Sequence, residues 1–211
     1  MRRVKTLSVL FFGGLFLAAC GGGEQESADM ADTGDMAATP TSELSCYATV
    51  TMAEAQERPS PLQRVELSVG GNDGLLCYGA PSARGRDIMG GLVPFGEPWR
   101  MGANEPTTLH LSGPATIQGV AVEPGSYSIY AIPGESEWTI VLNSTHERWG
   151  IPIDESVRAS DVGSFTVEPE TMDESVETLQ FRFEPTPDAP MGDIIMEWEN
   201  TRVSFHAHPA M

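Results

Sequence analysis

The sequence predicts an all-β protein: a single-domain antiparallel β-sandwich, preceded by a disordered acidic N-terminal leash. Two observations point to this fold class. Apolar and polar residues alternate with a period of two along most of residues 65–207, and Pro, Gly and Asn-Asp turn signals interrupt the alternation roughly every 8–12 residues. The strands are not separated by strong helical periodicity, which favours antiparallel pairing, because parallel neighbours need long crossover connections.

The expected strands are short and follow one another closely. In the first, Val65, Leu67 and Val69 alternate with polar residues, and the strand ends at the Gly-Gly-Asn-Asp-Gly turn of residues 70–74. Later segments repeat this pattern, at 75–78, 107–112, 115–118, 120–122, 126–132, 137–143, 163–168, 177–183, 193–200 and 201–207. Residues 51–58 are compatible with one small helix.

The first residues carry the pattern of a bacterial lipoprotein signal peptide. A basic start is followed by an apolar run that ends in a lipobox, Leu17-Ala18-Ala19-Cys20. The run is short for a bilayer span, which needs about 20 residues, so a permanent transmembrane helix is the less favoured interpretation. We expect residues 1–19 to be removed and the Cys20 sulfur to carry lipid that anchors the protein to a membrane.

The residues after the lipobox predict the cellular location of the protein and the boundary between its linker and its domain. No aspartate follows Cys20, so nothing argues for retention at the inner membrane. We expect a cell-envelope protein, an outer-membrane lipoprotein that faces the periplasm or the cell surface. Residues 20–58 are expected to form the lipidated flexible linker, because residues 21–43 hold six acidic residues and no basic ones. Residues 59–208 then form the β-sandwich domain, which is long enough for one core.

The charge of the chain is strongly negative, with 12 basic against 30 acidic residues and a formal net charge of −18. Loss of Arg2, Arg3 and Lys5 with the signal peptide would leave nine arginines, no lysine and a net charge of −21. Such a surface repels phosphate backbones, so a nucleic-acid partner is disfavoured. An acid excess without lysine predicts a halophilic source, because salt screens the self-repulsion, and greater stability in low NaCl would contradict this prediction.

Cys46 and Cys77 remain after lipidation. The envelope permits disulfides, and a bridge between them would close a loop of about 30 residues, worth roughly 3–4 kcal/mol. In the alternative, Cys77 is a small buried strand residue and Cys46 is a free thiol near the leash. Two cysteines do not reveal their separation in space, so the sequence leaves both alternatives open.

Three stretches, at residues 77–109, 122–143 and 196–205, resemble a bacterial family known as domain of unknown function 2911, a group of uncharacterised secreted and lipoprotein β domains. Its motifs run Tyr-Gly-Arg-Pro-Ser-x-Lys-Gly-Arg and Val-Trp-Arg-x-Gly-Ala-Asn-Glu. The matching positions are Tyr78, Gly79, Pro81, Ser82, Gly85, Arg86, Trp99, Arg100, Gly102, Ala103, Asn104 and Glu105. Ala80 stands where arginine is usual, and Arg84 where lysine is usual. The resemblance implies the fold, while no activity is established for the family.

Residues 79–104 concentrate positive charge in this acidic protein. Arg84, Arg86 and Arg100 lie there with only two acidic residues. The planar guanidinium suits carboxylates and phosphates, and nearby glycines allow close backbone approach. We therefore expect a shallow site for a small polar or anionic ligand, or for an envelope partner. Its expected lining residues are Arg84, Arg86, Trp99, Arg100, Asn104 and Glu105.

Three alternatives to this ligand site stay open. In a purely structural loop, the arginines pair with carboxylates and Trp99 belongs to the core. For a metal, His206 and His208 would project from one face of a strand and are weak candidates; His110 or Glu105 would have to complete the site, but nothing in the sequence places them nearby, so we expect no metal site. An uncharacterised hydrolase could use Ser82 or Glu105, but no Gly-x-Ser-x-Gly motif is present. The sequence also lacks a P-loop and a dinucleotide fingerprint, so we expect no cofactor, and it does not indicate the oligomeric state.

Overall fold

The computed structural model describes residues 44–210. The expected signal peptide, the lipidated Cys20 and the acidic stretch 21–43 lie outside the described residues. Within the part that is described, no helix is long and apolar enough to cross a bilayer.

Two short helices and ten strands make up this part of the chain. In chain order they are α1 (Met52–Glu57), β1 (Leu62–Val69), β2 (Asn72–Gly79), β3 (Ala103–Leu111), β4 (Ala115–Ile117), β5 (Val120–Val122), β6 (Gly125–Ile132), β7 (Trp138–Asn143), α2 (Glu155–Arg158), β8 (Asp161–Val167), β9 (Glu170–Pro185) and β10 (Gly192–Pro209). The two segments expected at 193–200 and 201–207 form one continuous strand, β10.

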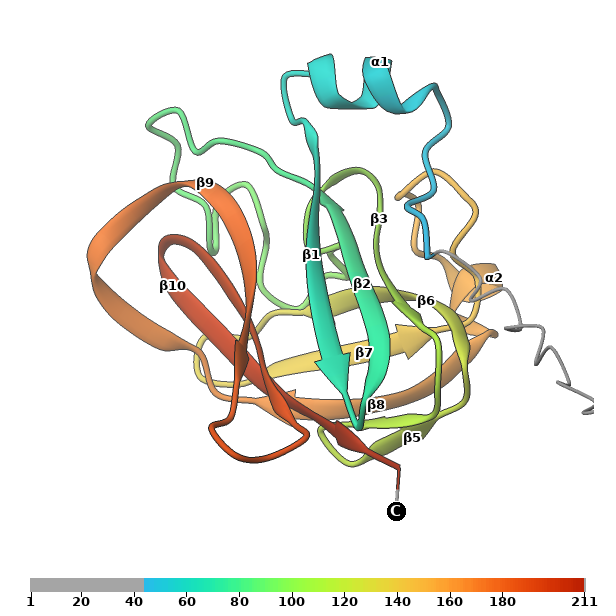
Figure 1. The fold of residues 1–211 in the computed structure, drawn as a ribbon. Coiled ribbons are helices and arrows are strands. Elements are labelled where there is room, and N and C mark those ends of the chain that lie inside the picture. Colours follow the sequence, from blue (N-terminus) through green and yellow to red (C-terminus); the bar gives the residue numbers. More distant parts are fainter. Residues whose placement is uncertain (1–43, 211) are drawn as a thin grey trace, which may run out of the picture. The chain divides into compact units, whose positions relative to one another are not determined.

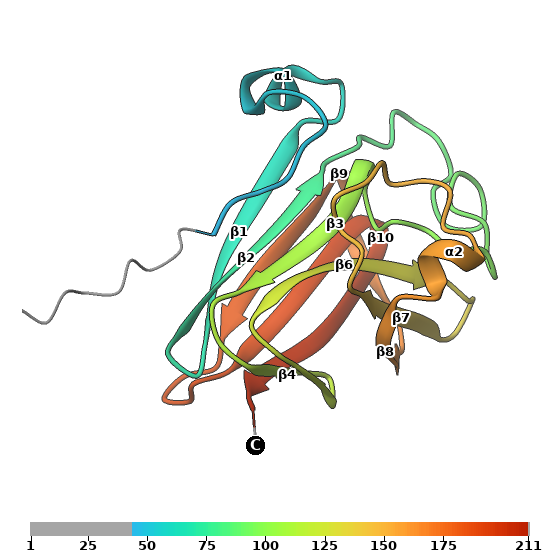
Figure 2. The same cartoon turned by 90° about the vertical axis from the view of Figure 1, so that its right-hand side faces the viewer.

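The strands form two antiparallel sheets that pack as a β-sandwich (Figure 1), which confirms the predicted fold class. The larger sheet has the order β1-β2-β3-β6-β7-β8, and the smaller has the order β5-β4-β10-β9. Figure 2 shows β9 and β10 behind β1, β2 and β3, with the smaller sheet covering one face of the larger sheet. The opposite face of the larger sheet is called the outer face below.

Apolar side chains from both sheets meet in one core, at whose centre three tryptophans make contact. Trp138 of β7 and Trp198 of β10 are each 1% exposed. Trp99, from the connection between β2 and β3, lies edge-on to Trp138 at a ring distance of 6.1 Å and stacks on Trp198 at 6.0 Å. The tryptophans therefore tie that connection to both sheets.

The glycine-rich connection, residues 80–102, crosses from one sheet to the other. The Ala83 N–H donates to the Glu177 carbonyl at 2.7 Å, which adds the start of the connection to the edge of β9. Near its end, Trp99 and Ala131 exchange two backbone hydrogen bonds of 2.7 and 2.8 Å, which add it to β6. This segment is therefore an integral part of the sandwich.

The hairpin of β9 and β10 bends sharply on itself, as Figure 1 shows at the labels of these strands. Its register shifts on both sides of Glu199, which has a φ of 54°. Asp193 and His206 belong to the same strand, yet their side chains are in hydrogen-bond contact. The bend lets one long hairpin cover the inner face of the six-stranded sheet.

Candidate functional site

The outer face of the six-stranded sheet carries a row of polar residues that the strand register aligns. Arg64 pairs with Cys77, Cys77 with Thr108, Thr108 with Ser128, and Ser128 with Asn143. Thr108, Ser128 and Asn143 are buried, although they point away from the core. Buried polar groups away from a core indicate that further chain covers them.

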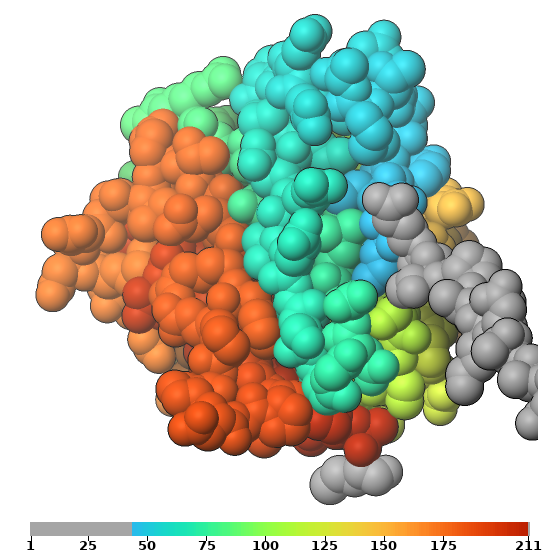
Figure 3. Space-filling view, in the orientation of Figure 1, coloured from blue at the N-terminus to red at the C-terminus, as the bar shows by residue number. Residues whose placement is uncertain are grey.

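Part of this cover is a segment that we call the strap, residues 44–60, which includes α1. Figure 3 shows the strap in blue beside β1 in teal. A disulfide joins Cys46 of the strap to Cys77 of β2, with a Cα–Cα distance of 5.7 Å. The sequence analysis places residues 20–58 in the flexible linker, whereas residues 44–58 are fastened to the sheet through the Cys46–Cys77 disulfide.

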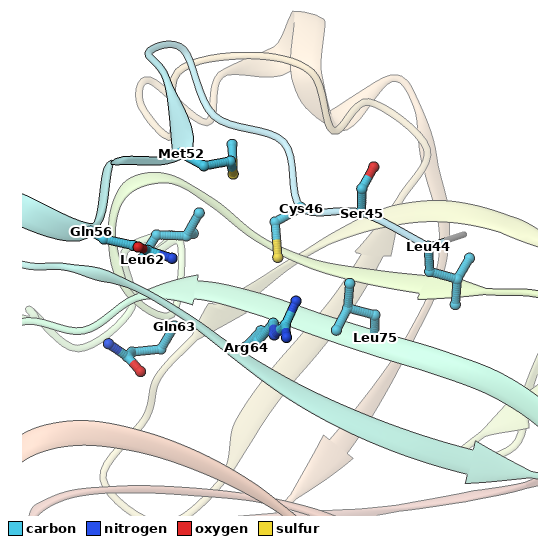
Figure 4. Close-up of a pocket in the computed structure, with 9 residues that line it drawn as sticks. All are labelled: Leu44, Ser45, Cys46, Met52, Gln56, Leu62, Gln63, Arg64 and Leu75. Carbon is cyan, nitrogen blue, oxygen red and sulfur yellow. The ribbon is translucent and has the colours of Figure 1, made fainter. Parts of the chain in front are cut away.

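A cavity of about 970 Å³ lies between the strap and the first two strands, and we call it the Arg64 cavity. Figure 4 shows its nine lining residues. Arg64 extends from β1 towards Cys46, and side chains of the strap face it from above. The residues that line the cavity are Leu44, Ser45, Cys46, Met52, Gln56, Leu62, Gln63, Arg64 and Leu75.

The Arg64 cavity has an unusual charge for this protein, because Arg64 is its one charged lining residue. Within residues 44–210, no ion pair or hydrogen bond joins the Arg64 guanidinium to a carboxylate. The chain as a whole has 30 acidic against 12 basic residues. A cation without a carboxylate partner in such a chain can accept an anionic ligand.

A second cavity, of about 290 Å³, lies on the other side of the strap, and we call it the His110 cavity. His110 Nδ1 lies 2.7 Å from Ser126 Oγ, and His110 Nε2 lies 3.0 Å from Thr108 Oγ1. His146 lies edge-on to His110 at a ring distance of 6.0 Å. Both cavities share Leu44, Ser45 and Cys46, so the strap and its disulfide separate them.

The chemistry of His110 suits hydrogen bonding better than catalysis. Burial, and then the neighbouring His146, lower the pKa of His110 to about 4, so its imidazole is neutral at physiological pH. Its ring nitrogens contact hydroxyl groups, and no carboxylate orients it. A base with so low a pKa activates Ser126 poorly, and this does not favour a hydrolase built on this pair.

The residues predicted to bind ligand are held mostly by contacts within the fold. Trp99 packs in the core, as described above, and the Asn104 side chain donates to the Ser60 carbonyl at 2.9 Å. Glu105 is 4% exposed and accepts hydrogen bonds from Thr49 and Arg58 of the strap. These contacts are the ones that the structural alternative expects.

The three arginines of the same prediction have different surroundings. Arg84 and Arg86 are exposed, and the Arg86 guanidinium donates to the carbonyls of Ala83 and Ser82 at 2.9 and 2.8 Å. Arg100 packs against Gly150, where an added Cβ would lie 2.3 Å from its Cδ. Burial lowers the pKa of Arg100, and the nearby Glu105 opposes this shift. That these arginines bind a ligand stays a prediction.

The weak metal candidates and the serine of the hydrolase alternative lie elsewhere. His206 is exposed and contacts Asp193, while His208 Nδ1 lies 3.1 Å from the Pro209 carbonyl. Residues 44–210 contain no group of three or more His, Cys, Asp or Glu side chains arranged to hold a metal ion. Ser82 Oγ lies 2.9 Å from Thr178 Oγ1, with which it shares a hydrogen bond.

Sequence reasoning gave no role to Arg64 or Ser126, and it considered His110 only as a further metal ligand beside His206 and His208. Arg64 and Glu66 alternate with Val65 and Leu67, and His110 lies between Leu109 and Leu111, so the outward direction of the Arg64 and His110 side chains was readable. The residues that lie beside these side chains could not be read from the sequence, because the pairing of Arg64 with Cys77 and of His110 with Ser126 depends on strand order and register.

Comparisons with known proteins agree with the resemblance seen in the motifs. A search of curated proteins and a search of solved structures each found no match. A family model described as "Protein of unknown function (DUF2911)" matches residues 60–207, which include β1 to β9, most of β10 and the Arg64 and His110 side chains. The match covers well over half of the chain, and the chain therefore belongs to the DUF2911 family.

Proposed function

We propose that the protein binds a small anionic molecule in the Arg64 cavity and does so as a lipid-anchored protein of the cell envelope. The observation that carries the binding proposal is the guanidinium of Arg64, which lines a cavity of about 970 Å³ without a carboxylate partner among the described residues. The volume lies in the range of small-molecule sites.

Electrostatics support an anion over a cation or a neutral sugar. The net charge of −18 repels anions at long range, so a site for them needs a local positive charge. Arg64 supplies that charge, and its planar fork can donate two parallel hydrogen bonds to a carboxylate or phosphate. The side-chain amide of Gln56 offers a further hydrogen-bond donor in the same lining.

The envelope address rests on the signal-peptide pattern and on the lipobox that ends at Cys20. The Cys46–Cys77 disulfide supports export, because disulfides persist in oxidising compartments and are rare in the cytosol. Membrane fractionation and metabolic labelling with palmitate test the anchor. Wild-type protein should carry label and sediment with membranes, whereas Cys20→Ser should carry none; equal labelling of the two would refute lipidation at Cys20.

Calorimetric titration tests the binding site. The chain from Gly21 onward contains every residue of the core and of both cavities, and it can be titrated with acetate, phosphate and succinate at low and high NaCl. Arg64→Gln should weaken anion binding by about ten-fold or more, because it removes a charge-assisted hydrogen bond. Arg158→Gln, at an exposed arginine of α2, is the charge-matched control and should bind as wild type.

The outcome also separates the two candidate locations. If Arg84→Gln weakens binding and Arg64→Gln does not, the ligand binds at the glycine-rich connection that the sequence predicted. If no anion binds the wild-type protein, the structural alternative is favoured over both.

A further inference from the structure

We infer that the ligand of the Arg64 cavity is an amphipathic monoanion, a single-chain carboxylate whose charged end pairs with Arg64 and whose hydrocarbon end lies against the apolar wall. This inference rests on the proposed function and narrows it to a class of ligand. Its support comes from the composition of the wall, the number of charges in it and the position of the strap.

The apolar wall comes from two directions. Leu62 and Leu75 rise from β1 and β2, while Leu44 and Met52 belong to the strap. Met52 is 43% exposed, although it is a large apolar side chain. A hydrocarbon placed between the strap and the sheet would remove apolar area on both of its sides from water.

The polar wall indicates a single negative charge on the ligand. Arg64 is the one cation among the nine lining residues, and no acidic residue lines the cavity. A ligand with several negative charges would leave some of them without a counter-charge in a protein that is already strongly acidic. The amide of Gln56, on the strap, is a neutral donor that can bind the second oxygen of one carboxylate.

The strap and the sheet each contribute polar and apolar side chains to the cavity. Thr51 caps α1 through reciprocal hydrogen bonds with Glu54, so the helix begins at Met52. Met52 and Gln56 are four residues apart and therefore lie on one side of the helix. Figure 4 shows both facing the cavity, above β1. One ligand molecule can thus contact an apolar and a polar group of α1 while its carboxylate meets Arg64.

A homologous series of ligands tests the inference. The chain from Gly21 onward is titrated with acetate, butyrate, hexanoate and octanoate, and with hexanol as the neutral counterpart of hexanoate. The association constant should rise with chain length, by up to about 4-fold for each methylene that is fully buried. Hexanoate should bind at least ten-fold more tightly than hexanol, and Arg64→Gln should remove that difference.

A matched pair of methionine variants tests the apolar wall. Met52→Gln should reduce the increase in association constant for each added methylene, since it replaces the apolar side chain that faces the cavity. Met191→Gln is the control, because Met191 has a similar exposure of 39% and lies on the far hairpin turn, outside the Arg64 cavity. A gain per methylene that is unchanged in Met52→Gln would contradict the placement of the hydrocarbon.

The outcomes distinguish this inference from the proposed function. If all the carboxylates bind with equal affinity and all require Arg64, the anion site stands and the amphipathic ligand class is refuted. If none of the monocarboxylates binds, or if hexanol binds as tightly as hexanoate, the amphipathic ligand class is refuted, and the anion site is refuted as well if phosphate and succinate also fail to bind.

Discussion

The carboxylate of Glu105 accepts a hydrogen bond of 2.7 Å from the guanidinium of Arg58, and this ion pair fastens the strap to β3. The same carboxylate accepts hydrogen bonds from Thr49, at 2.8 Å from the backbone N–H and at 2.5 Å from the hydroxyl. Burial opposes ionisation of Glu105, but these hydrogen bonds outweigh it and hold its pKa below the usual value. Two positions of the strap thus converge on one buried charge.

Glu105→Gln should therefore lower the free energy of unfolding by about 2–4 kcal/mol, since it leaves Arg58 without its counter-charge. Urea unfolding measures the loss, and a glutamate-specific protease that cuts at Glu54 or Glu57 reports release of the strap. Glu135→Gln, at an exposed glutamate, is the control and should stay within about 0.5 kcal/mol of wild type. Equal stability of the two variants would show that the ion pair does not hold the strap.

The disulfide is the second fastening of the strap, and it closes a loop with a sequence separation of 31. Replacing both cysteines, as Cys46→Ser with Cys77→Ala, should lower the free energy of unfolding by roughly 3–4 kcal/mol in the chain-entropy model. The variant should also bind acetate and hexanoate more weakly than wild type, because Cys46 lines both cavities. Denaturant unfolding and calorimetry test the two effects. Unchanged anion binding would show that the strap does not shape the Arg64 cavity.

The sheets were predictable from the sequence, because alternation is a local signal. Val65, Leu67 and Val69 reveal an inward face within five residues of chain. The site was not predictable, because the row from Arg64 to Asn143 is assembled across five strands, and β3 pairs with β6 only after β4 and β5 intervene in the chain.

The arginines of the glycine-rich connection show the opposite case, in which residues that are close in the sequence predicted a shared site. Arg84, Arg86 and Arg100 are close in the sequence, but nearness along the chain says little about where a side chain points. The Arg86 partners are backbone carbonyls of its own loop, which no sequence pattern displays. For Trp99 the sequence left a ligand site and the core as alternatives, and the structure places its ring against tryptophans of both sheets.

The neutral state of His110 makes a pH-dependent contribution to stability. Its pKa is about 4 in the folded protein against 6.5 for the ordinary group, so the unfolded chain binds more protons between these values. The contribution is present above pH 6.5 and is lost as the pH falls towards 4, by about 3 kcal/mol in total. The groups that face His110 are the hydroxyls of Thr108 and Ser126 together with His146, and Glu147 lines the same cavity.

His110→Gln should therefore flatten the loss of stability between pH 6.5 and 4 relative to wild type. His206→Gln, at an exposed histidine, is the matched control and should leave most of that loss in place. Urea unfolding at intervals of pH measures both. An NMR titration of His110 with a midpoint near 6.5 would contradict a buried neutral imidazole.

Glu197 fixes the bend of the long hairpin. Its carboxylate is 7% exposed and accepts hydrogen bonds from Gln180 and Arg182 of β9 and from Arg202 of β10. Burial opposes its ionisation, but these bonds prevail and lower the pKa of Glu197 to about 2. The contribution of Glu197 to the free energy of unfolding is thus fully present above about pH 4.5, the ordinary pKa of the group, and is lost as the pH falls towards 2.

Glu197→Gln should lower the free energy of unfolding at pH 7 by about 3–5 kcal/mol, because two arginines lose a buried counter-charge. Glu184→Gln is the matched control: Glu184 also pairs with Arg182, but it is 59% exposed, so its loss should cost at most about 1 kcal/mol. The difference between the variants should shrink in unfolding experiments near pH 2.5, where the carboxylate of the unfolded chain is already protonated. A difference that stays constant from pH 7 to 2.5 would show that packing of the bend, and not the charge of Glu197, holds β9 and β10 in place.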